Sequence, residues 1–258
     1  MKIITAADDN YFKFLRYLED NIFKFYKEYP LIYDLGINET SIHSLKSKVK
    51  KLKINTDYAC FDSRGNIKAT HKPLCILDFL NSYECLDCLY IDADILFSKY
   101  VSRKFFKNTD FAVAHRHYKE QSNDHFLNGF INSGVIYIRN NNKAKKIIID
   151  WYNECTKENM TDQLALSNLI MNKTNIYQKS DFIYLKEDEI QLKILNPSIY
   201  NDTSLCTGNI LHFKNAGRSD RIFKRYKTYS KLIKVNKYLC KIYMIFKNLK
   251  LYNKIKID

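Results

Sequence analysis

Apolar and polar positions in the first 40 residues follow the order strand, helix, strand. A short apolar run at 3–7 predicts a buried strand, and the polar residues 8–10 end it. An amphipathic helix is predicted next, ending near Pro30, because apolar residues recur there at spacings of three and four: Leu15, Leu18, Ile22 and Phe25. Residues 30–36 predict a second strand that runs into a turn. This order is the usual opening of a parallel α/β sheet.

The same reading predicts further elements up to residue 217. Strands are predicted at 54–61, 88–91, 111–114 and 135–138, and helices at 73–80, 143–155 and 162–171. The basic stretch Lys46–Lys53 is interpreted as the solvated face of a helix. The sequence contains no internal repeat and no Gly/Ser linker. We therefore expect residues 1–217 to form one α/β domain, with a mostly parallel sheet flanked by helices.

Residues 218–258 have a different character. Apolar residues recur there at spacings of three and four between lysines, at Leu232, Val235, Leu239, Ile242, Phe246 and Leu249. This pattern predicts a basic amphipathic helical tail. Such a tail can lie on an anionic membrane surface. It can also dock on the main domain, or pair two chains as a short coiled coil.

Charge changes this picture mainly for the tail. The chain of 258 residues carries a net charge of +14, of which the 13 basic and two acidic residues at 218–258 supply +11. The basicity therefore belongs to the tail, which argues against nucleic acid as a partner of the whole protein. The oligomeric state cannot be derived from the sequence.

Cysteine usage and hydropathy indicate the compartment. The seven cysteines are an odd number without a visible secretion signal, so free thiols are expected. The Cys85–Cys88 pair has metal-type spacing but no second pair, which argues against a zinc site. No apolar run approaches the roughly 20 residues of a membrane span. We expect a cytoplasmic protein that can associate peripherally with the inner face of a membrane.

The triplet Asp92-Ala93-Asp94 is the strongest candidate for chemistry. It follows directly on the predicted strand 88–91, where alternation points residues two apart to the same side. Open α/β sheets bind ligands at the carboxyl ends of their strands. Two neighbouring carboxylates repel each other unless a cation lies between them, which suits Mn²⁺ or Mg²⁺ shared with a diphosphate. The alternative is an acidic pair in a turn or at a helix start.

The segment Leu89–Asp94 resembles the metal motif of nucleotide-sugar glycosyltransferases of the GT-A fold, particularly glycosyltransferase family 8. Four further segments are similar to family landmarks in the same order: 5–11, 131–135, 162–163 and 211–213. The resemblance implies a GT-A (Rossmann-like) fold and a UDP-sugar donor. It also implies transfer of a hexosyl unit to a hydroxyl of a glycan or lipid-linked acceptor, with retention of the anomeric configuration.

The resemblance assigns the donor-binding residues by position. Ala6, Asp8 and Asn10 correspond to the uridine segment, where a carboxylate and an amide suit uracil N3–H and ribose hydroxyls. Asp8 alternatively only caps the following helix. Asn132 and Ser133 correspond to a segment next to the donor sugar, although an ordinary turn remains open. Ala93 lies between the two carboxylates, and we count it as donor-binding.

The remaining assignments concern catalysis, metal and phosphate. By resemblance, Asp162 and Gln163 face the anomeric carbon, and the Gln163 carbonyl would stabilise an oxocarbenium-like centre; simple helix capping is the alternative. His212 would complete the metal site with Asp92 and Asp94. Two lysines, Lys72 and Lys214, are candidates to neutralise the donor diphosphate, although both can equally be solvated surface residues.

Two departures from the family pattern stand out. Residues 212–218 lack the glycine and the Pro-Trp that usually follow the family histidine, so Lys214 or Arg218 would have to substitute. An acid usual after the strand at 111–114 is replaced by residues 115–117, His-Arg-His, and Asp124 in the adjoining loop is a candidate substitute. A sugar nucleotidyltransferase is a rival reading, but it would carry a Gly-rich basic loop after the first strand. A non-catalytic sugar-nucleotide-binding relative is the other.

Overall fold

The computed structural model describes most of the chain. The described residues are 1–52, 59–62, 65–68, 70–116, 129–157, 160–173, 182–185, 189–204, 208–214, 219–236, 238, 240, 242–243 and 245–246. All structural statements below concern these residues.

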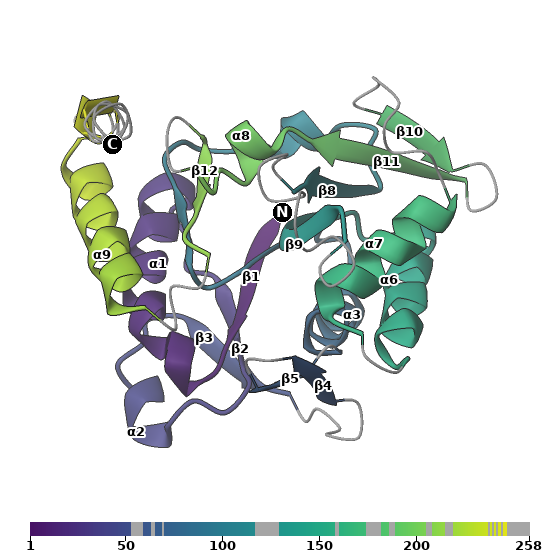
Figure 1. Cartoon of the computed structure of the whole chain (residues 1–258), viewed down its shortest axis with the longest axis horizontal. Coiled ribbons are helices and arrows are strands. Elements are labelled where there is room, and N and C mark those ends of the chain that lie inside the picture. The colour runs from purple at the N-terminus through teal and green to yellow at the C-terminus, as the bar shows by residue number, and fades with distance from the viewer. Residues whose placement is uncertain are drawn as a thin grey trace, which may run out of the picture.

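An eight-stranded sheet forms the centre of the molecule, in the order β10-β11-β8-β9-β6-β1-β2-β3 (Figure 1). Its strands are β1 (Lys2–Ala7), β2 (Leu31–Asp34), β3 (Lys48–Lys51), β6 (Cys88–Ile91), β8 (Phe111–His115), β9 (Ile131–Ile138), β10 (Phe182–Leu185) and β11 (Ile190–Leu195). The pairs β6–β1, β1–β2, β2–β3 and β8–β11 are parallel. Strand β9 runs antiparallel to both β6 and β8, and β10 runs antiparallel to β11. The predicted mostly parallel α/β sheet is confirmed.

Helices cover both faces of this sheet. They are α1 (Asp9–Tyr26), α2 (Glu39–Ile42), α3 (His71–Ser82), α6 (Asn142–Cys155), α7 (Asp162–Lys173), α8 (Pro197–Tyr200) and α9 (Asp220–Val235). Alternate residues of β1 point to opposite faces, so Ile4 packs with α3, α6 and α7 while Ile3 packs with α1. Figure 1 shows α1 and α9 on one side and α3, α6 and α7 on the other. The chain therefore buries one apolar cluster on each side of the sheet.

A smaller sheet lies next to the ends of these strands. Strand β7 (Ile95–Phe97) follows β6 after a short turn and pairs antiparallel with β12 (Ile210–His212). Both strands pack against α9 in a third apolar cluster that includes Phe14 of α1 and Tyr226 of α9. The Tyr226 hydroxyl donates to the carbonyl of Ile95 at 3.2 Å, and its ring meets Phe14 edge to face. Helix α9 thus packs against the strand that leaves the Asp92–Asp94 turn.

One predicted element is wrong in type. The basic stretch at Lys46–Lys53 is not a helix face, because Lys48–Lys51 forms the edge strand β3 and pairs with β2. Lys50 on this strand reaches the carboxylate of Asp78 on α3 at 2.6 Å. Lysines on an edge strand discourage pairing with another chain, which explains the basic pattern without a helix. Of the predicted strand at 54–61, residues 54–58 lie outside the described residues, and Ala59–Asp62 forms β4 in a hairpin with β5 (Gly65–Lys68).

The tail differs from the predicted continuous helix. Helix α9 ends at Val235, and its C-cap Asn236 has extended backbone angles. Val235, Ile242 and Phe246 are exposed, whereas Leu239 and Leu249 lie outside the described residues. The structure therefore does not place the whole predicted stripe on one helix. None of the described helices is both long enough and apolar enough to cross a membrane.

Candidate functional site

The Asp92-Ala93-Asp94 triplet forms the turn between β6 and β7. Two backbone hydrogen bonds hold this turn, from Asp92 N–H to the Gly134 carbonyl at 2.9 Å and from Phe213 N–H to the Asp94 carbonyl at 3.0 Å. The triplet lies just after the strand, so the turn, and not strand alternation, sets the directions of its carboxylates. Ala93 is buried in the apolar cluster on the α1 side.

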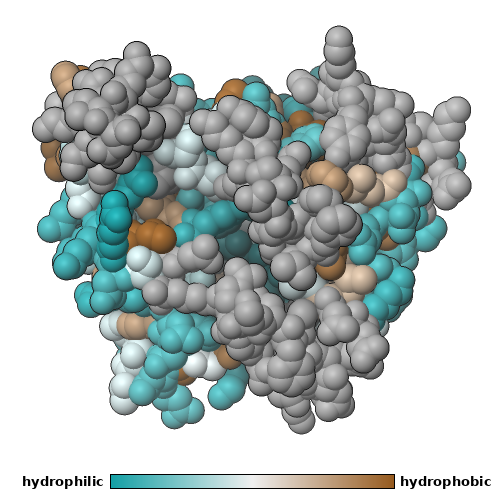
Figure 2. Space-filling view, in the orientation of Figure 1, coloured by the Kyte–Doolittle hydropathy of each residue, from teal (hydrophilic) through white to brown (hydrophobic). Residues whose placement is uncertain are grey.

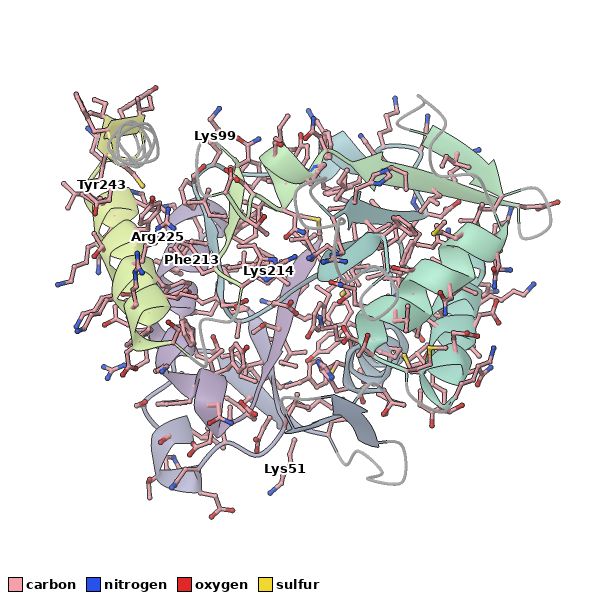
Figure 3. The ribbon with its side chains drawn as sticks, in the orientation of Figure 1. Lys51, Lys99, Phe213, Lys214, Arg225 and Tyr243 are labelled. Atoms are coloured by element: carbon pink, nitrogen blue, oxygen red, sulfur yellow. The ribbon has the colours of Figure 1, made fainter. Side chains whose placement is uncertain are left out.

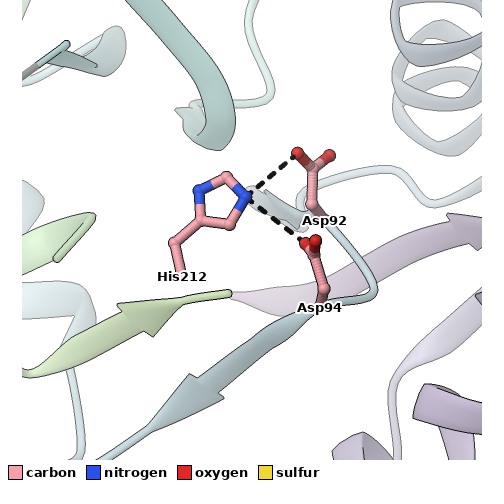
Figure 4. Close-up of side chains that lie close together, drawn as sticks. All are labelled: Asp92, Asp94 and His212. Carbon is pink, nitrogen blue, oxygen red and sulfur yellow. Dashed lines mark ion pairs between the residues drawn. The ribbon is translucent and has the colours of Figure 1, made fainter. Parts of the chain in front are cut away.

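His212 reaches the two carboxylates from β12 (Figure 4). Its Nε2 lies 3.3 Å from Oδ1 of Asp94 and 3.8 Å from Oδ2 of Asp92. One potential ligand atom from each residue lies within 4.8 Å of the others. Asp94 and His212 are buried, while the Asp92 side chain is 25% exposed. Two carboxylates and one imidazole around a common point suit Mn²⁺ or Mg²⁺, with one ligand open to solvent.

Lys72, in the first turn of α3, is buried against this site. Its ammonium lies 2.9 Å from Oδ1 of Asp92 and 2.8 Å from Oδ2 of Asp162, and it donates to Oγ of Ser133 at 3.0 Å. Burial lowers the pKa of Lys72, but the two carboxylates outweigh burial and raise its pKa above the usual value. The predicted phosphate-binding lysine therefore bridges two acidic groups in the structure.

Asp162 is the first residue of α7, and its Oδ2 has two partners. It accepts from Ser133 Oγ at 2.7 Å in addition to the Lys72 contact. Burial raises the pKa of Asp162, while the positive charge of Lys72 lowers it more, so the carboxyl stays ionised. Thr161, not Asp162, caps the helix by accepting from Leu164 N–H at 3.0 Å. The Asp162 carboxylate is thus directed to the site.

The segment Asn132-Ser133-Gly134 lies inside β9 and not before it, as the sequence had indicated. The pairing register between β8 and β9 shifts at this point, from Val113↔Ile136 to Ala114↔Asn132. The side chain of Asn132 accepts from Gly134 N–H at 2.8 Å. A Cβ on Gly134 would lie 2.5 Å from Cε1 of His212, so only glycine lets the imidazole approach β9 this closely.

The predicted uridine residues stand at the same edge of the sheet. Ala6 and Asp8 come two and four residues after Ile4, which pairs with Tyr90 just before the Asp92–Asp94 turn. Asp8 caps α1 by accepting from Tyr11 N–H at 3.1 Å, and Asn10 donates to its second oxygen at 3.4 Å. The capping alternative thus holds for Asp8. Since Asn10 is exposed and Asp8 half-buried, both remain accessible to a ligand.

Three other predicted residues, Lys214, Gln163 and His115, also lie among the described residues. Lys214 follows the β12 end, and Figure 3 shows it toward the centre of the molecule while Phe213 lies toward α9. Gln163 is half-buried in the first turn of α7, next to Asp162. His115 ends β8, whereas His117, Asp124 and Arg218 lie outside the described residues. Figure 2 shows a hollow with hydrophilic surface near the centre of this face of the molecule.

Asn201 is a site residue that the sequence did not indicate. Its Oδ1 lies 2.8 Å from Nδ1 of His212, and both side chains are buried. No motif marks Asn201, because its position beside the histidine depends on the pairing of the neighbouring Asp202 with Leu211. The available signal was only its place in a short polar segment before a strand.

The family model for nucleotide-diphospho-sugar transferases matches residues 2–230. The chain belongs to the nucleotide-diphospho-sugar transferase family. The match spans all the site residues described above and extends into α9, as far as Ser230. A comparison with curated proteins gave no match.

Three solved structures agree with this chain in fold at low sequence identity. An active-site variant of LgtC matches with a TM-score of 0.55 and 14% identity, over 88% of this chain and 94% of that chain. The galactosyltransferase LgtC with donor and acceptor sugar analogues matches with a TM-score of 0.50 and 16% identity, over 90% and 95%. A glycosyltransferase involved in glycosylation of the major capsid of PBCV-1 matches with a TM-score of 0.53 and 10% identity, over 88% and 98%.

These likenesses confirm the predicted GT-A fold for this nucleotide-diphospho-sugar transferase. Together with the family match they confirm that the protein is a glycosyltransferase resembling family 8.

Proposed function

We propose that the protein transfers a hexosyl unit from a UDP-sugar to a hydroxyl of a glycan or lipid-linked acceptor, with retention of configuration and with Mn²⁺ or Mg²⁺ as cofactor. The observation that carries this proposal is the convergence of Asp92, Asp94 and His212, whose ligand atoms lie within 4.8 Å of one another in a glycosyltransferase fold. The bound cation would neutralise the negative charge that develops on the nucleoside diphosphate as it leaves.

The protein's own residues supply the remaining electrostatics. Lys72 forms ion pairs with both Asp92 and Asp162. It therefore fixes the position of one metal ligand and of one residue that faces the donor sugar. Ser133 fixes Asp162 from β9. In this arrangement the ionised Asp162 accepts hydrogen bonds from sugar hydroxyls, and the Gln163 carbonyl stabilises positive charge at the anomeric carbon. Positioning supplies most of the remaining rate enhancement.

Donor recognition rests on the strand ends beside the metal turn. Asp8 and Asn10 bind uracil and ribose, with Ala6 against the nucleoside, while Ala93 and Asn132 adjoin the donor from the turn and β9. Asn132 is buried and its oxygen accepts from Gly134 N–H, so only its Nδ2 group remains to donate to a sugar hydroxyl. Lys214, two residues after the end of β12, is a second candidate to neutralise the diphosphate, beside Lys72.

The decisive experiment removes one metal ligand. Turnover of a panel of UDP-sugars with Mn²⁺ would be measured for the wild type, for Asp94→Asn and for Asp150→Asn, a control on the outer helix α6. We expect Asp94→Asn to lose at least about 100-fold in kcat, because loss of metal charge stabilisation is worth several kcal/mol. Full activity of Asp94→Asn would refute the metal assignment. Nucleotide-sugar binding without turnover in the wild type would favour the non-catalytic alternative.

The nucleotide is tested separately. Thermal shifts with UDP-, GDP- and CMP-sugars in the presence of Mn²⁺ should show stabilisation by the UDP-sugars alone, since a ligand that binds the native state raises the unfolding temperature. The Asp8→Ala variant should lose that shift more than Asp9→Ala, whose carboxylate bonds Asn38 N–H outside the site. A shift with GDP- or CMP-sugars only would contradict the uridine assignment.

The tail suits an anionic membrane surface, which would bring the enzyme to a lipid-linked acceptor. Five basic residues of α9 are exposed: Arg221, Lys224, Lys227, Lys231 and Lys234. Each contributes about 1 kcal/mol near an anionic bilayer. Co-sedimentation with phosphatidylglycerol vesicles, but not with phosphatidylcholine vesicles, is expected. It should be lost in the variant that combines Lys224→Glu, Lys227→Glu and Lys231→Glu. Equal sedimentation of this variant and the wild type would contradict a role for α9.

A further inference from the structure

We propose that Asn201 is a positioning residue for the metal site: it holds the imidazole of His212 with the proton on Nδ1, so that the lone pair of Nε2 faces the cation. This inference rests on the proposed metal-dependent function. It adds a residue that is neither a metal ligand nor a donor contact, and that no sequence motif marks.

The contact is short and buried. Oδ1 of Asn201 lies 2.8 Å from Nδ1 of His212, and the exposed fractions of the two residues are 2% and 5%. Water therefore does not compete for the imidazole nitrogen. A hydrogen bond between two buried neutral groups is costly to lose, because either partner is then left unsatisfied.

Backbone contacts hold Asn201 where it is. It is the C-cap of α8, and its N–H donates to the carbonyl of Pro197 at 3.1 Å. The next residue, Asp202, donates to the Ile210 carbonyl at 2.9 Å and accepts from His212 N–H at 3.0 Å. Asn201 and His212 are thus tied together through main-chain bonds as well as through their side chains. These bonds fix the backbone of Asn201 relative to that of His212, which keeps the amide within reach of the ring.

The direction of the side-chain bond decides which ring nitrogen is available. An amide oxygen only accepts, so it requires the proton of the neutral imidazole on Nδ1. Nε2 then carries the lone pair, and it lies 3.3 Å from Oδ1 of Asp94 and 3.8 Å from Oδ2 of Asp92. A lone pair aimed at two carboxylates is unfavourable unless a cation lies between them. The tautomer chosen by Asn201 is therefore the one that a metal ligand needs.

A second element confines the ring near Nδ1. Gly134 of β9 leaves so little room that a Cβ there would stand 2.5 Å from Cε1 and 2.9 Å from Nδ1 of His212. The imidazole is thus confined by the Asn201 amide and by the backbone of β9. Such a ring does not lose rotational freedom when the cation binds, so the site is preorganised.

The test compares three variants with the wild type. Asn201→Leu removes the acceptor, Asn201→Asp keeps an oxygen acceptor, and Asn140→Leu removes an amide that bonds the Leu80 and Tyr83 carbonyls away from the site. Nitrogen-15 NMR of the metal-free protein at pH 8 reports the His212 tautomer, and calorimetric titration with Mn²⁺ in the presence of UDP reports affinity. We expect Asn201→Leu to bind Mn²⁺ about 10- to 100-fold more weakly, with the Nδ1–H tautomer no longer dominant. Asn201→Asp and Asn140→Leu should keep both properties close to those of the wild type.

Two results would overturn the proposal. One is a wild-type tautomer with the proton on Nε2, which would mean that the amide nitrogen faces the ring. The other is Mn²⁺ affinity in Asn201→Leu equal to that of the wild type. If the wild type binds no Mn²⁺ at all, the proposed function fails instead, and the tautomer of the metal-free protein still decides whether Asn201 orients the ring.

Discussion

Adding a single methyl group to the backbone of β9 should disable the metal site while leaving the fold intact. In Gly134→Ala the new Cβ would lie 2.5 Å from Cε1 of His212, whereas ordinary contacts begin at 3.4 Å. The ring must therefore retreat by about 0.9 Å, the difference between these two distances. Metal–ligand bonds tolerate deviations of only about 0.2 Å, so Nε2 can no longer bind an ion held by Asp92 and Asp94.

The backbone itself should accept alanine. Gly134 lies in β9, beside the shift in pairing register, and its φ is not in the left-handed region, so alanine can adopt its backbone conformation. The cost in stability is that of modest overpacking, about 1–3 kcal/mol. We expect Mn²⁺ affinity in the presence of UDP to fall about 10- to 100-fold, as for loss of support to a ligand. Calorimetric titration measures the affinity and urea unfolding measures the stability.

A double-mutant cycle isolates the proposed cause. Gly134→Ala is combined with His212→Ala, which removes the ring that the new methyl group would push. If displacement of the imidazole causes the loss, Gly134→Ala should have no further effect on Mn²⁺ affinity in the His212→Ala background. The reasoning is refuted if Gly134→Ala binds Mn²⁺ like the wild type, or if its effect is equally large without His212.

Three further predictions concern stability. Lys72→Met leaves the buried Asp162 without its cation and should cost about 3 kcal/mol in urea unfolding; an unchanged midpoint would mean that the ion pair is not formed. Asn141→Ala removes the cap that accepts from Ala144 N–H at 2.8 Å and should cost about 1 kcal/mol by the same measurement; no loss would contradict the capping role. Burial lowers the pKa of His115 below its usual 6.5, so the unfolded chain binds this proton more readily and stability should decrease as the pH falls from 7 to 5. His115→Gln should flatten that decrease, and an identical slope in both proteins would count against it.

Local patterns determined much of the fold. The period of apolar residues placed β1, α1, α3, β6, α6 and α7 correctly, because the buried side of a helix or strand must repeat with the geometry of that element. The order of the short motifs predicted the GT-A fold and the glycosyltransferase family, since each motif is a short run of neighbouring residues. These features depend on residues that are close in sequence, so they can be predicted from the sequence alone.

Packing decided what local pattern did not. Lys48–Lys51 became an edge strand because β2 offered a pairing partner, although its lysines suggested a helix face. The first half of the tail packs on α1 through Phe14 and Tyr226, where the amphipathic pattern alone fitted a membrane equally well. The division of the chain at residue 217 stays a prediction, because α9 contacts the same strands that carry the site.

The cluster of Asp92, Asp94 and His212 shows the same distinction at the level of single atoms. The sequence by itself determined the residue types, two carboxylates after a strand and a late histidine. Only the tertiary structure brought these residues together and assigned Lys72 to the carboxylates, and only it placed Asn201 beside the imidazole. The physical reason is that composition and spacing determine which groups a chain offers, whereas the direction of a side chain depends on contacts with residues far away in sequence.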